Sequence, residues 1–475
     1  MKGYTLKLLI LAFSGCIYSL YAHSEEPQTL IDRLPEHWEY TEGFSQEFPS
    51  DDKWWEIFND TLLDSLIREG ENNNYNLREA GRRIEMARAT ITQAKSGYYP
   101  SFSVDASYIR ARTSGLTTSA SASAMNTGYF SGMLNMSWEV GIFGKIQNQV
   151  KEEEANYSAS RADYASVCVS LCAEIAADYM SLRTLQEELR VTEEHLKTQK
   201  EVLDITQTRF EVGLVSMLDV AQAKTVYYST KASLSTLRTQ IATTINAIAI
   251  LTGNFPQDMF ARLSQYQPQP KTEYAVKVGI PMNIIRRRPD VMEAEYQLAA
   301  YAAAVGVAKK DFLPTVSLNG SLGTSAYHAK DLFSKNSFEY SIAPTISWTF
   351  FDGFSRKASE ASAREQFLAG IDSYNQTILT ALQEVDNAMI TYTESLKYEN
   401  ELEEVIKNAQ LSFNLALDRY KQGLDAFINV ADSQLTLLEY ANELVTARGN
   451  TLAALISLYK ALGGGWDIYY SDKNQ

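Results

Sequence analysis

The sequence RFEVGL at residues 209–214 recurs as RYKQGL at residues 419–424, 210 positions further along a chain of 475 residues. Three further pairs of short motifs keep the same order at nearly the same offset: DVA at 219–221 and NVA at 429–431, SW at 137–138 and 347–348, and YYP at 98–100 and FLP at 312–314. Ordered self-similarity at one offset is typical of a duplicated structural unit. The sequence therefore predicts a tandem repeat.

Each predicted repeat contains segments in which apolar and polar residues alternate. These segments are 102–110, 134–140, 316–322 and 338–350. Alternation with a period of two residues is typical of β-strands that have one apolar and one polar face. The four segments predict two β-hairpins, whose polar tips fall at residues 113–127 and 327–337.

The rest of each repeat has a helical composition. Between Lys145 and Glu211 there is no proline and no glycine, and alanine, glutamate, leucine and glutamine, which favour helices, are abundant. One helix over this segment would be about 100 Å long, at about 1.5 Å per residue. Long helices are also predicted after Gly213, over 355–422 and over 426–462, and helices of this length are expected to pack like coiled coils.

The first residues have the pattern of a secretory signal. Basic residues flank an apolar run at 8–13, which is too short to span a membrane. The small residues 14–15 directly before Cys16 resemble a bacterial lipobox, in which cleavage leaves a cysteine that carries a lipid. The alternative is ordinary cleavage after Ser24. Both interpretations predict export.

Composition excludes several classes of protein. The chain has 43 Lys+Arg and 58 Asp+Glu, and the net charge of −15 has the wrong sign for a general nucleic-acid binder. After the first 24 residues no uncharged apolar run reaches the roughly 18 residues of a spanning helix, which excludes a multi-helix transporter. The four histidines are scattered, and no nucleophile–base set or cofactor-binding loop is visible. We therefore expect no enzymatic activity, no cofactor and no metal site.

Cys168 and Cys172 are the two cysteines outside the N-terminal region. Four residues apart on a helix, they share one face, but the backbone holds them apart for an easy disulfide. A metal pair would need a nearby histidine or a further cysteine, and the sequence shows neither. We therefore expect two packed, small apolar side chains.

Three arginines at 286–288 could form a basic patch. They directly precede Pro289, Asp290 and a predicted helix, and a negative charge is favourable near a helix N-terminus. We interpret the segment as a structural junction.

Four amphipathic strands are too few to close a barrel, and an open apolar sheet edge promotes aggregation. In a membrane every strand edge must be paired, so sheets span it only as closed barrels. Three copies of the chain would supply twelve strands, within the range of outer-membrane barrels, with apolar faces toward the lipid. The alternative is a secreted β-sandwich that carries a helical stalk.

Motifs along essentially the whole mature chain resemble those of the TolC/NodT-type outer-membrane efflux channels, specifically the lipoprotein branch that serves tripartite pumps. They include WW at 54–55, FND at 58–60, NL at 76–77, RRPDV at 287–291 and FDG at 351–353. The resemblance implies a mainly α-helical homotrimer with four strands per protomer in a twelve-stranded β-barrel in the outer membrane. It also implies a long α-helical barrel in the periplasm, a mixed equatorial region and a passive, gated conduit with no enzyme site.

The resemblance also implies partners and a cargo. The partners would be two further copies of the chain, a periplasmic adaptor protein, an inner-membrane transporter and outer-membrane lipid. The cargo would be drug-like compounds, toxic compounds or metabolites, moved by a proton-driven pump. Two other functions stay open at this point, which are type I protein secretion through the same kind of channel and a structural or adhesive surface stalk.

Repeat and resemblance together divide the chain into six segments. They are a signal peptide at 1–15, an N-terminal extended segment at 16–56, a first repeat at 57–255, an equatorial connection at 256–284, a second repeat at 285–463 and a tail at 464–475. The first repeat contains a hairpin at 101–143 and long helices at 145–253. The second repeat contains a hairpin at 315–351 and long helices at 355–462.

The family's gate lies at the periplasmic tip, where each long helix pair turns, which corresponds to Gly213 and Gly423. Tyr420 matches a tyrosine that latches to an acidic residue, and Asp219 matches its partner. Asp425 stands where the family channel has a latch arginine. The resemblance therefore implies the tyrosine contact but not the arginine latch.

Carboxylate rings narrow the pore of that family channel, and the matching positions here are Asn429 and Asp432. Asp432 alone stays acidic, so a trimer would carry one ring of three carboxylates, which attracts cations. The alternative is a solvated charge on a helix face. Leu214 and Leu424, beside the turn glycines, are expected either to contact the adaptor or to cap the turn within the same protomer.

Overall fold

The computed structural model describes residues 29–41, 43–47, 53–114 and 125–466. The predicted signal peptide, Cys16 and the last residues of the tail lie outside the described residues. The chain forms two compact units, and each contains parts of both predicted repeats. Among the described residues, the first unit comprises those in 29–34, 91–155 and 297–378, and the second comprises those in 35–90, 156–296 and 379–466.

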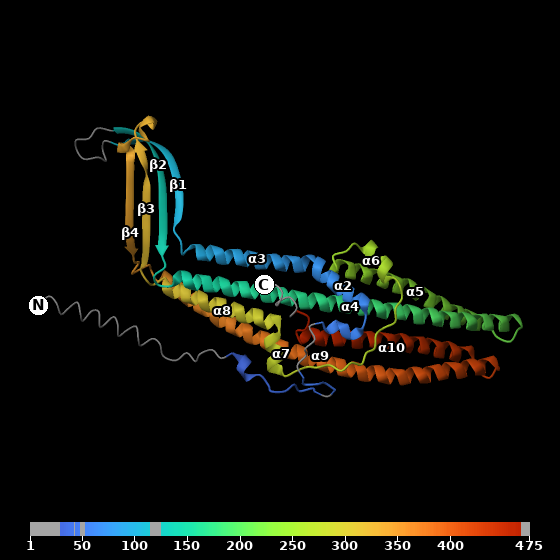
Figure 1. Ribbon diagram of the computed structural model, residues 1–475. Helices are drawn as coiled ribbons and strands as arrows, with labels where there is room; N and C mark the ends of the chain where they lie inside the picture. The colour runs from blue at the N-terminus through green and yellow to red at the C-terminus, as the bar shows by residue number, and fades with distance from the viewer. Residues whose placement is uncertain (1–28, 42, 48–52, 115–124, 467–475) are drawn as a thin grey trace. The chain divides into compact units, whose positions relative to one another are not determined.

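The first unit contains a four-stranded antiparallel sheet (Figure 1). Its strands are β1 (Ser101–Thr113), β2 (Met125–Val140), β3 (Thr315–Ala326) and β4 (Phe338–Ser347), and they lie in sequence order. This confirms the two predicted hairpins. The strands of the first hairpin are longer than the alternating pattern indicated, because glycine and serine near its tip hide the alternation.

The pairing register separates an apolar from a polar face of the sheet. Residues directly opposite each other on neighbouring strands share a face. Val104 pairs with Leu134, Leu134 pairs with Leu322, and Leu322 pairs with Tyr340, so one face is apolar across all four strands. On the other face cross-strand hydrogen bonds join Asn135 Nδ2 to Asp105 Oδ2 at 2.6 Å, Ser107 Oγ to Ser131 Oγ at 2.8 Å, and Ser137 Oγ to Asn319 Oδ1 at 3.1 Å. The polar face is therefore held by its own side chains.

The two outer strands each have one unpaired edge. In the described part of the chain β1 pairs with β2 alone and β4 pairs with β3 alone. Large apolar side chains on these strands are exposed, among them Val104 at 79 %, Tyr340 at 72 % and Ile346 at 75 %. An exposed, apolar, open-edged sheet is a surface that needs a further partner.

The helices repeat in length as well as in sequence. The long helices α4 (Lys145–Glu211) and α9 (Ser355–Lys421) have 67 residues each, and α5 (Met217–Leu251) and α10 (Phe427–Ala461) have 35 each. Shorter α3 (Tyr75–Ser96) and α8 (Pro289–Lys310) have 22 each. The remaining helical elements are η1 (Leu30–Arg33), η2 (Trp54–Phe58), α2 (Thr61–Asn73), α6 (Pro256–Leu263), α7 (Pro281–Arg287), η3 (Ala329–Asp331) and η4 (Lys335–Ser337). Equal lengths in equal order confirm the predicted duplication and long helices.

One helix in the described chain, α4, contains an 18-residue window apolar enough to cross a membrane by length and composition. Most of this window, 61 %, is buried inside the protein. A helix that buries most of its apolar side chains against other helices has the character of a core helix.

In the second unit the N-terminal segment packs on the long helices. Trp54 is 1 % exposed and stacks on Tyr459 of α10, with ring centroids 5.3 Å apart and an angle of 9° between the rings. Leu63, Leu66 and Ile67 of α2 are fully buried. These contacts fix the segment before α2 to the long helices.

The connection between the repeats is tied to both long helices. From α4, Arg183 Nη1 donates to the carbonyl oxygen of Gln265 at 3.1 Å, and Gln186 Nε2 donates to that of Leu263 at 2.8 Å. From α9, the Tyr392 hydroxyl donates to the carbonyl oxygen of Thr272 at 3.0 Å. Buried polar side chains thus donate hydrogen bonds to backbone carbonyls of a segment that has little backbone pairing of its own.

The arginine-rich segment is a structural junction, as predicted. Arg288 is 6 % exposed, and its Nη1 donates to the carbonyl oxygen of Ala461 at the end of α10, at 2.9 Å. Its guanidinium also binds Asp290 in the first turn of α8 and Glu384 of α9. One arginine therefore joins three helices.

Candidate functional site

The two turns between the long helices have the same backbone geometry. The N–H of Gly213 donates to the carbonyl of Phe210 at 2.9 Å, and the N–H of Leu214 donates to that of Arg209 at 2.8 Å. In the second turn Gly423 and Leu424 donate to Tyr420 and Arg419, both at 2.9 Å. This pair of bonds is a Schellman motif, which needs a residue in the left-handed region after the helix. Gly213 has φ +76° and Gly423 has φ +74°.

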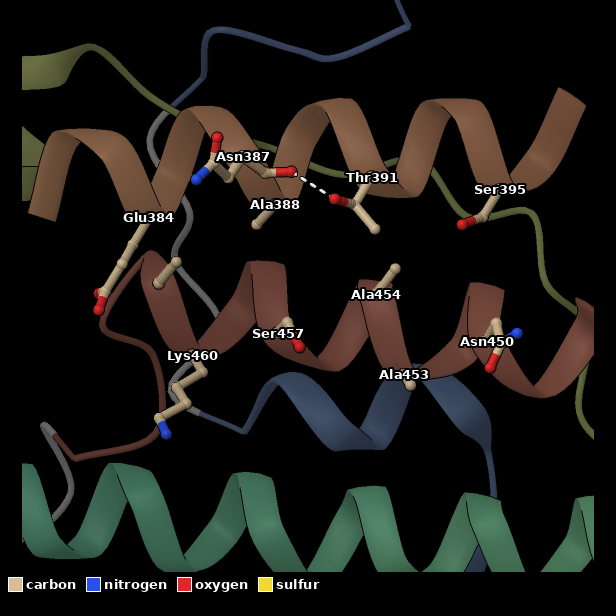
Figure 2. A pocket seen from close by; sticks show the side chains of 11 residues that line it. Glu384, Asn387, Ala388, Thr391, Ser395, Asn450, Ala453, Ala454, Ser457 and Lys460 are labelled. Carbon is tan, nitrogen blue, oxygen red and sulfur yellow. Dashed lines mark hydrogen bonds between the residues drawn. The ribbon is translucent and has the colours of Figure 1, made fainter. Parts of the chain in front are cut away.

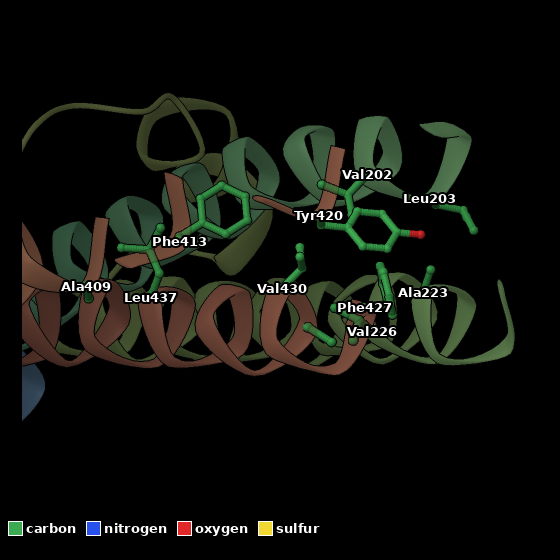
Figure 3. Close-up of a cluster of buried hydrophobic side chains, with 11 residues drawn as sticks. Val202, Leu203, Ala223, Val226, Ala409, Phe413, Tyr420, Phe427, Val430 and Leu437 are labelled. Atoms are coloured by element: carbon green, nitrogen blue, oxygen red, sulfur yellow. The ribbon is translucent and has the colours of Figure 1, made fainter. Parts of the chain in front are cut away.

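Both turns lie at the end of one shared apolar cluster (Figure 3). Buried members come from all four long helices, and they are Val202, Leu203, Ala223, Val226, Ala409, Phe413, Tyr420, Phe427, Val430, Ala431 and Leu437. Tyr420 meets Phe427 edge to face, with ring centroids 5.4 Å apart. The cluster sets the two turns side by side within the second unit.

Arg209 bridges the two turns, a role that the sequence did not indicate. Its guanidinium lies over the ring of Tyr420, 4.9 Å from the centroid. Its Nη1 also donates to the carbonyl oxygen of Lys421 at 2.7 Å, at the C-terminal end of α9. A cation is favourable at a helix C-terminus and over an aromatic face. Arg209 is the first residue of the RFEVGL motif, but the motif alone does not show which helix end its side chain reaches.

Tyr420 is placed beside the predicted partner Asp219, but no hydrogen bond joins their side chains in the described residues. The Tyr420 hydroxyl is buried and has no hydrogen-bond partner there. Burial raises the pKa of Tyr420; the neighbouring Thr206 side chain lowers it in part, and the negative charge of Asp219 raises it. Asp219 accepts instead from Ser216 Oγ at 3.3 Å.

Asp425 braces the second turn. Its Oδ1 accepts from Asn429 Nδ2 at 2.5 Å and from the N–H of Ala426 at 2.9 Å, while Oδ2 faces Arg419 Nε at 3.3 Å. These donors lower the pKa of Asp425, the Asn429 amide most of all. The position at which the family channel has a latch arginine is therefore occupied by an ionised carboxylate just before α10. A negative charge is favourable near a helix N-terminus.

The other predicted site residues are exposed. Asp432 and Asn429 lie on the open face of α10, and Leu214 and Leu424 are 67 % and 63 % exposed. The leucine backbones take part in the turns, but their side chains do not pack inside the protomer. Exposed leucines beside both turns form two apolar points at the end of the helix pairs.

The structure adds an acidic neighbour to the cysteine pair. Cys168 and Cys172 are free and fully buried, and Glu71 of α2 brings a carboxylate beside them. The pKa of the Cys172 thiol is raised well above its ordinary value, by its hydrogen bond with Cys168 and by burial. Sequence reasoning missed Glu71, because 101 residues separate it from Cys172.

A groove lies between α9 and α10 (Figure 2). Its volume is about 730 Å³, and short side chains such as Ala388, Ala454 and Ser457 line much of it. The hydroxyl of Thr391 donates to the carbonyl of Asn387 on its own helix rather than to a base. This is the pattern of a packing surface rather than of a nucleophilic site.

The sequence and fold match known proteins over nearly the whole chain. The family described as "Outer membrane efflux protein" matches residues 66–254 and 280–464. The toluene efflux pump outer membrane protein TtgC of Pseudomonas putida is 29 % identical over 99 % of this chain and 97 % of its own length. The solvent efflux pump outer membrane protein SrpC of Pseudomonas putida is 30 % identical over 87 % of each chain.

A solved structure of the outer-membrane channel OprN has a TM-score of 0.85 and 28 % identity, covering 94 % of this chain and 99 % of that one. The predicted efflux-channel family and fold class are thus confirmed, and transport rather than catalysis is the work of such proteins. The chain belongs to the outer membrane efflux protein family.

Proposed function

We propose that this chain is the outer-membrane duct of a tripartite efflux pump and that three copies form the duct. The observation that carries the proposal is the four-stranded sheet, which has one apolar face and two unpaired edges. If β1 of each copy pairs with β4 of the next, three copies form a closed barrel of twelve strands that has no unpaired edge. The apolar faces then meet lipid, and the serine- and asparagine-rich faces line a wet lumen.

The long helices support the same assembly. Each copy contributes two antiparallel helix pairs whose turn ends share one apolar cluster, so three copies would wall a helical duct with twelve long helices. A lipid on Cys16 would hold the N-terminus to the membrane. Intact mass spectrometry of the mature protein tests this, because a lipid raises its mass and Cys16→Ser abolishes the gain.

We place the gate at the two turns. Asp432 would form a ring of three carboxylates on the duct axis, with Asn429 one turn before it. Tyr420 and Asp219, the latch pair of the resemblance, share no hydrogen bond here, so the contacts of Arg209 and Asp425 would hold the two turns in place. Opening of the gate would move the two turns apart. It would break the contacts that Arg209 or the apolar cluster makes between them.

The docking surface is the set of exposed turn residues. Leu214 and Leu424 present an apolar side chain beside Gly213 and Gly423, and three copies would form a ring of six such points. A periplasmic adaptor with matching apolar pockets would seal the duct to an inner-membrane transporter.

The names of the relatives support small apolar cargo, since they include toluene and solvent efflux pumps.

The gate assignment is tested by the conductance and ion selectivity of Asp432→Ala in planar bilayers. We expect the variant to raise the resting conductance and to lose preference for cations. The matched control is Asp258→Ala, an exposed carboxylate in α6 away from the turns. Equal conductance and selectivity in wild type, Asp432→Ala and Asp258→Ala would remove Asp432 from the gate.

A further inference from the structure

Three side chains of types that can bind a metal meet in the second unit, on helices α2 and α4. Glu71, Cys168 and Cys172 each offer one ligand atom, and these atoms all lie within 4.8 Å of one another. Both cysteines are 0 % exposed, and Glu71 is half-buried. The cluster plays no part in the turns or in the sheet, so the proposed duct does not explain it.

The local fold brings the three residues together. The cysteines are four residues apart on α4, so their Sγ atoms project from one face of the helix. α2 approaches that face closely because residue 70 is glycine, where a Cβ would lie 2.4 Å from Cδ1 of Ile175. The next residue, Glu71, then reaches the sulfur atoms, and its Oε1 lies 3.8 Å from Cys172 Sγ.

The distances suit one ion bound by sulfur and oxygen. Metal–sulfur and metal–oxygen bonds of about 2.3 and 2.1 Å at the tetrahedral angle place the two ligand atoms about 3.6 Å apart, close to the 3.8 Å between Cys172 Sγ and Glu71 Oε1. Thiolates are soft ligands that select zinc and similar d¹⁰ ions over magnesium or calcium. The helix spacing disfavours a disulfide, so the two thiols stay available as separate ligands.

We propose that Cys168, Cys172 and Glu71 bind one divalent thiophilic ion of the zinc and cadmium class. Binding replaces two thiol protons, which leave to solvent, and forms two metal–sulfur bonds and one metal–oxygen bond with no change of oxidation state. Two thiolates, one carboxylate and a divalent cation sum to a charge of −1, the same as that of the metal-free site with two protonated thiols and one carboxylate. The ion would clamp α2 to α4, and the half-buried Glu71 provides an entry path.

Cadmium is the probe, because its thiolate complexes have an ultraviolet charge-transfer band. Full-length, detergent-extracted protein is reduced, freed of metal and titrated with Cd(II). We expect the band to saturate at one ion per chain, zinc to compete for the site, and the melting temperature to rise with bound metal. Cys168→Ser and Cys172→Ser should each weaken binding by more than about tenfold.

Two glutamate variants distinguish binding of the ion by Glu71 from nonspecific attraction of the ion to acidic side chains. Glu71→Gln should keep part of the band and weaken binding, whereas Glu174→Gln, an exposed glutamate on α4, should bind as the wild type does. Helical circular dichroism of every variant, and a Cys168→Ala variant, guard against loss of folding. The proposal is overturned if the wild type with both thiols reduced gives no band, if the Cys168→Ala/Cys172→Ala variant keeps it, or if Glu71→Gln binds unchanged.

Discussion

Two glycines with positive φ angles, Gly213 and Gly423, allow the chain to reverse between its long helices. A side chain at Gly213 would meet no atom within 4 Å, so any cost of substitution comes from the backbone alone. The left-handed conformation costs an ordinary L-residue about 1–2 kcal/mol, and asparagine tolerates it better. The residue identity at this point is therefore set by conformation and not by packing.

Gly213→Ala is expected to destabilise the first turn by about 1 kcal/mol. Amide hydrogen exchange of the peptide that contains the turn measures the free energy of local opening. Gly213→Asn serves as the matched variant and should lose less. Equal protection in the wild type and in Gly213→Ala would show that the turn does not depend on its left-handed residue.

His195 on α4 gives the chain a pH-dependent element within the second unit. Burial lowers the pKa of His195 below its ordinary 6.5. The unfolded chain therefore takes up this proton at a higher pH than the folded chain, and stability falls as the pH drops through 6.5 and below. Above 6.5 both states are neutral at this residue and it contributes no slope.

His195→Gln should remove that dependence. The melting temperatures of wild type and variant, compared above and below the ordinary histidine pKa, are expected to differ more at the lower pH, where the wild type alone loses stability. A constant difference at the two pH values would mean that His195 is as easily protonated in the folded chain as in the unfolded one.

Local motifs predicted some of these residues and missed others. The repeated hexapeptide pointed to Gly213, Gly423 and Tyr420, because the turn signal lies within a few residues of sequence. Glu71 and the position of the Arg209 guanidinium depend on which helices pack together, and a single sequence does not encode that in any local pattern. The expectation of no metal site weighed histidine and cysteine alone, so it did not consider Glu71, a carboxylate that another helix brings beside the two cysteines.

For elements, helix bounds were predicted to within one residue for α4, α9 and α10, because glycines lie just outside their ends. Their packing was not predictable in detail. The junction at Arg288 is an example, since its neighbours Asp290, Glu384 and Ala461 belong to three different helices. The prediction of a structural junction holds, and the structure supplies the contacts.

Arg288→Met is expected to lower the stability of the second unit by about 2 kcal/mol, because hydrogen bonds to charged groups are lost while Asp290 and Glu384 keep partial contact with water. Arg288→Lys keeps the charge but loses the planar fork, so it should lose less. Thermal unfolding followed by circular dichroism measures both variants. A methionine variant as stable as the wild type would show that the junction is held by apolar packing alone.

At the scale of the whole molecule, duplication explains why two hairpins and two long helix pairs occur in one chain. Four strands with open edges do not form a finished structure, and the apolar face of the sheet has no cover within the described residues. Sequence periodicity predicted this sheet well, since an alternating pattern determines faces as well as strands. The membrane requires the sheet to close, but it does not set the number of copies that close it.

Single-channel recording of the purified, detergent-extracted protein in planar lipid bilayers shows whether the chain forms a gated duct. If three copies close a barrel above a gated duct, the wild type produces small, discrete, cation-selective conductance steps. Protein that adds no conductance above that of the bare bilayer, when intact and correctly folded, would contradict the account and favour the surface stalk.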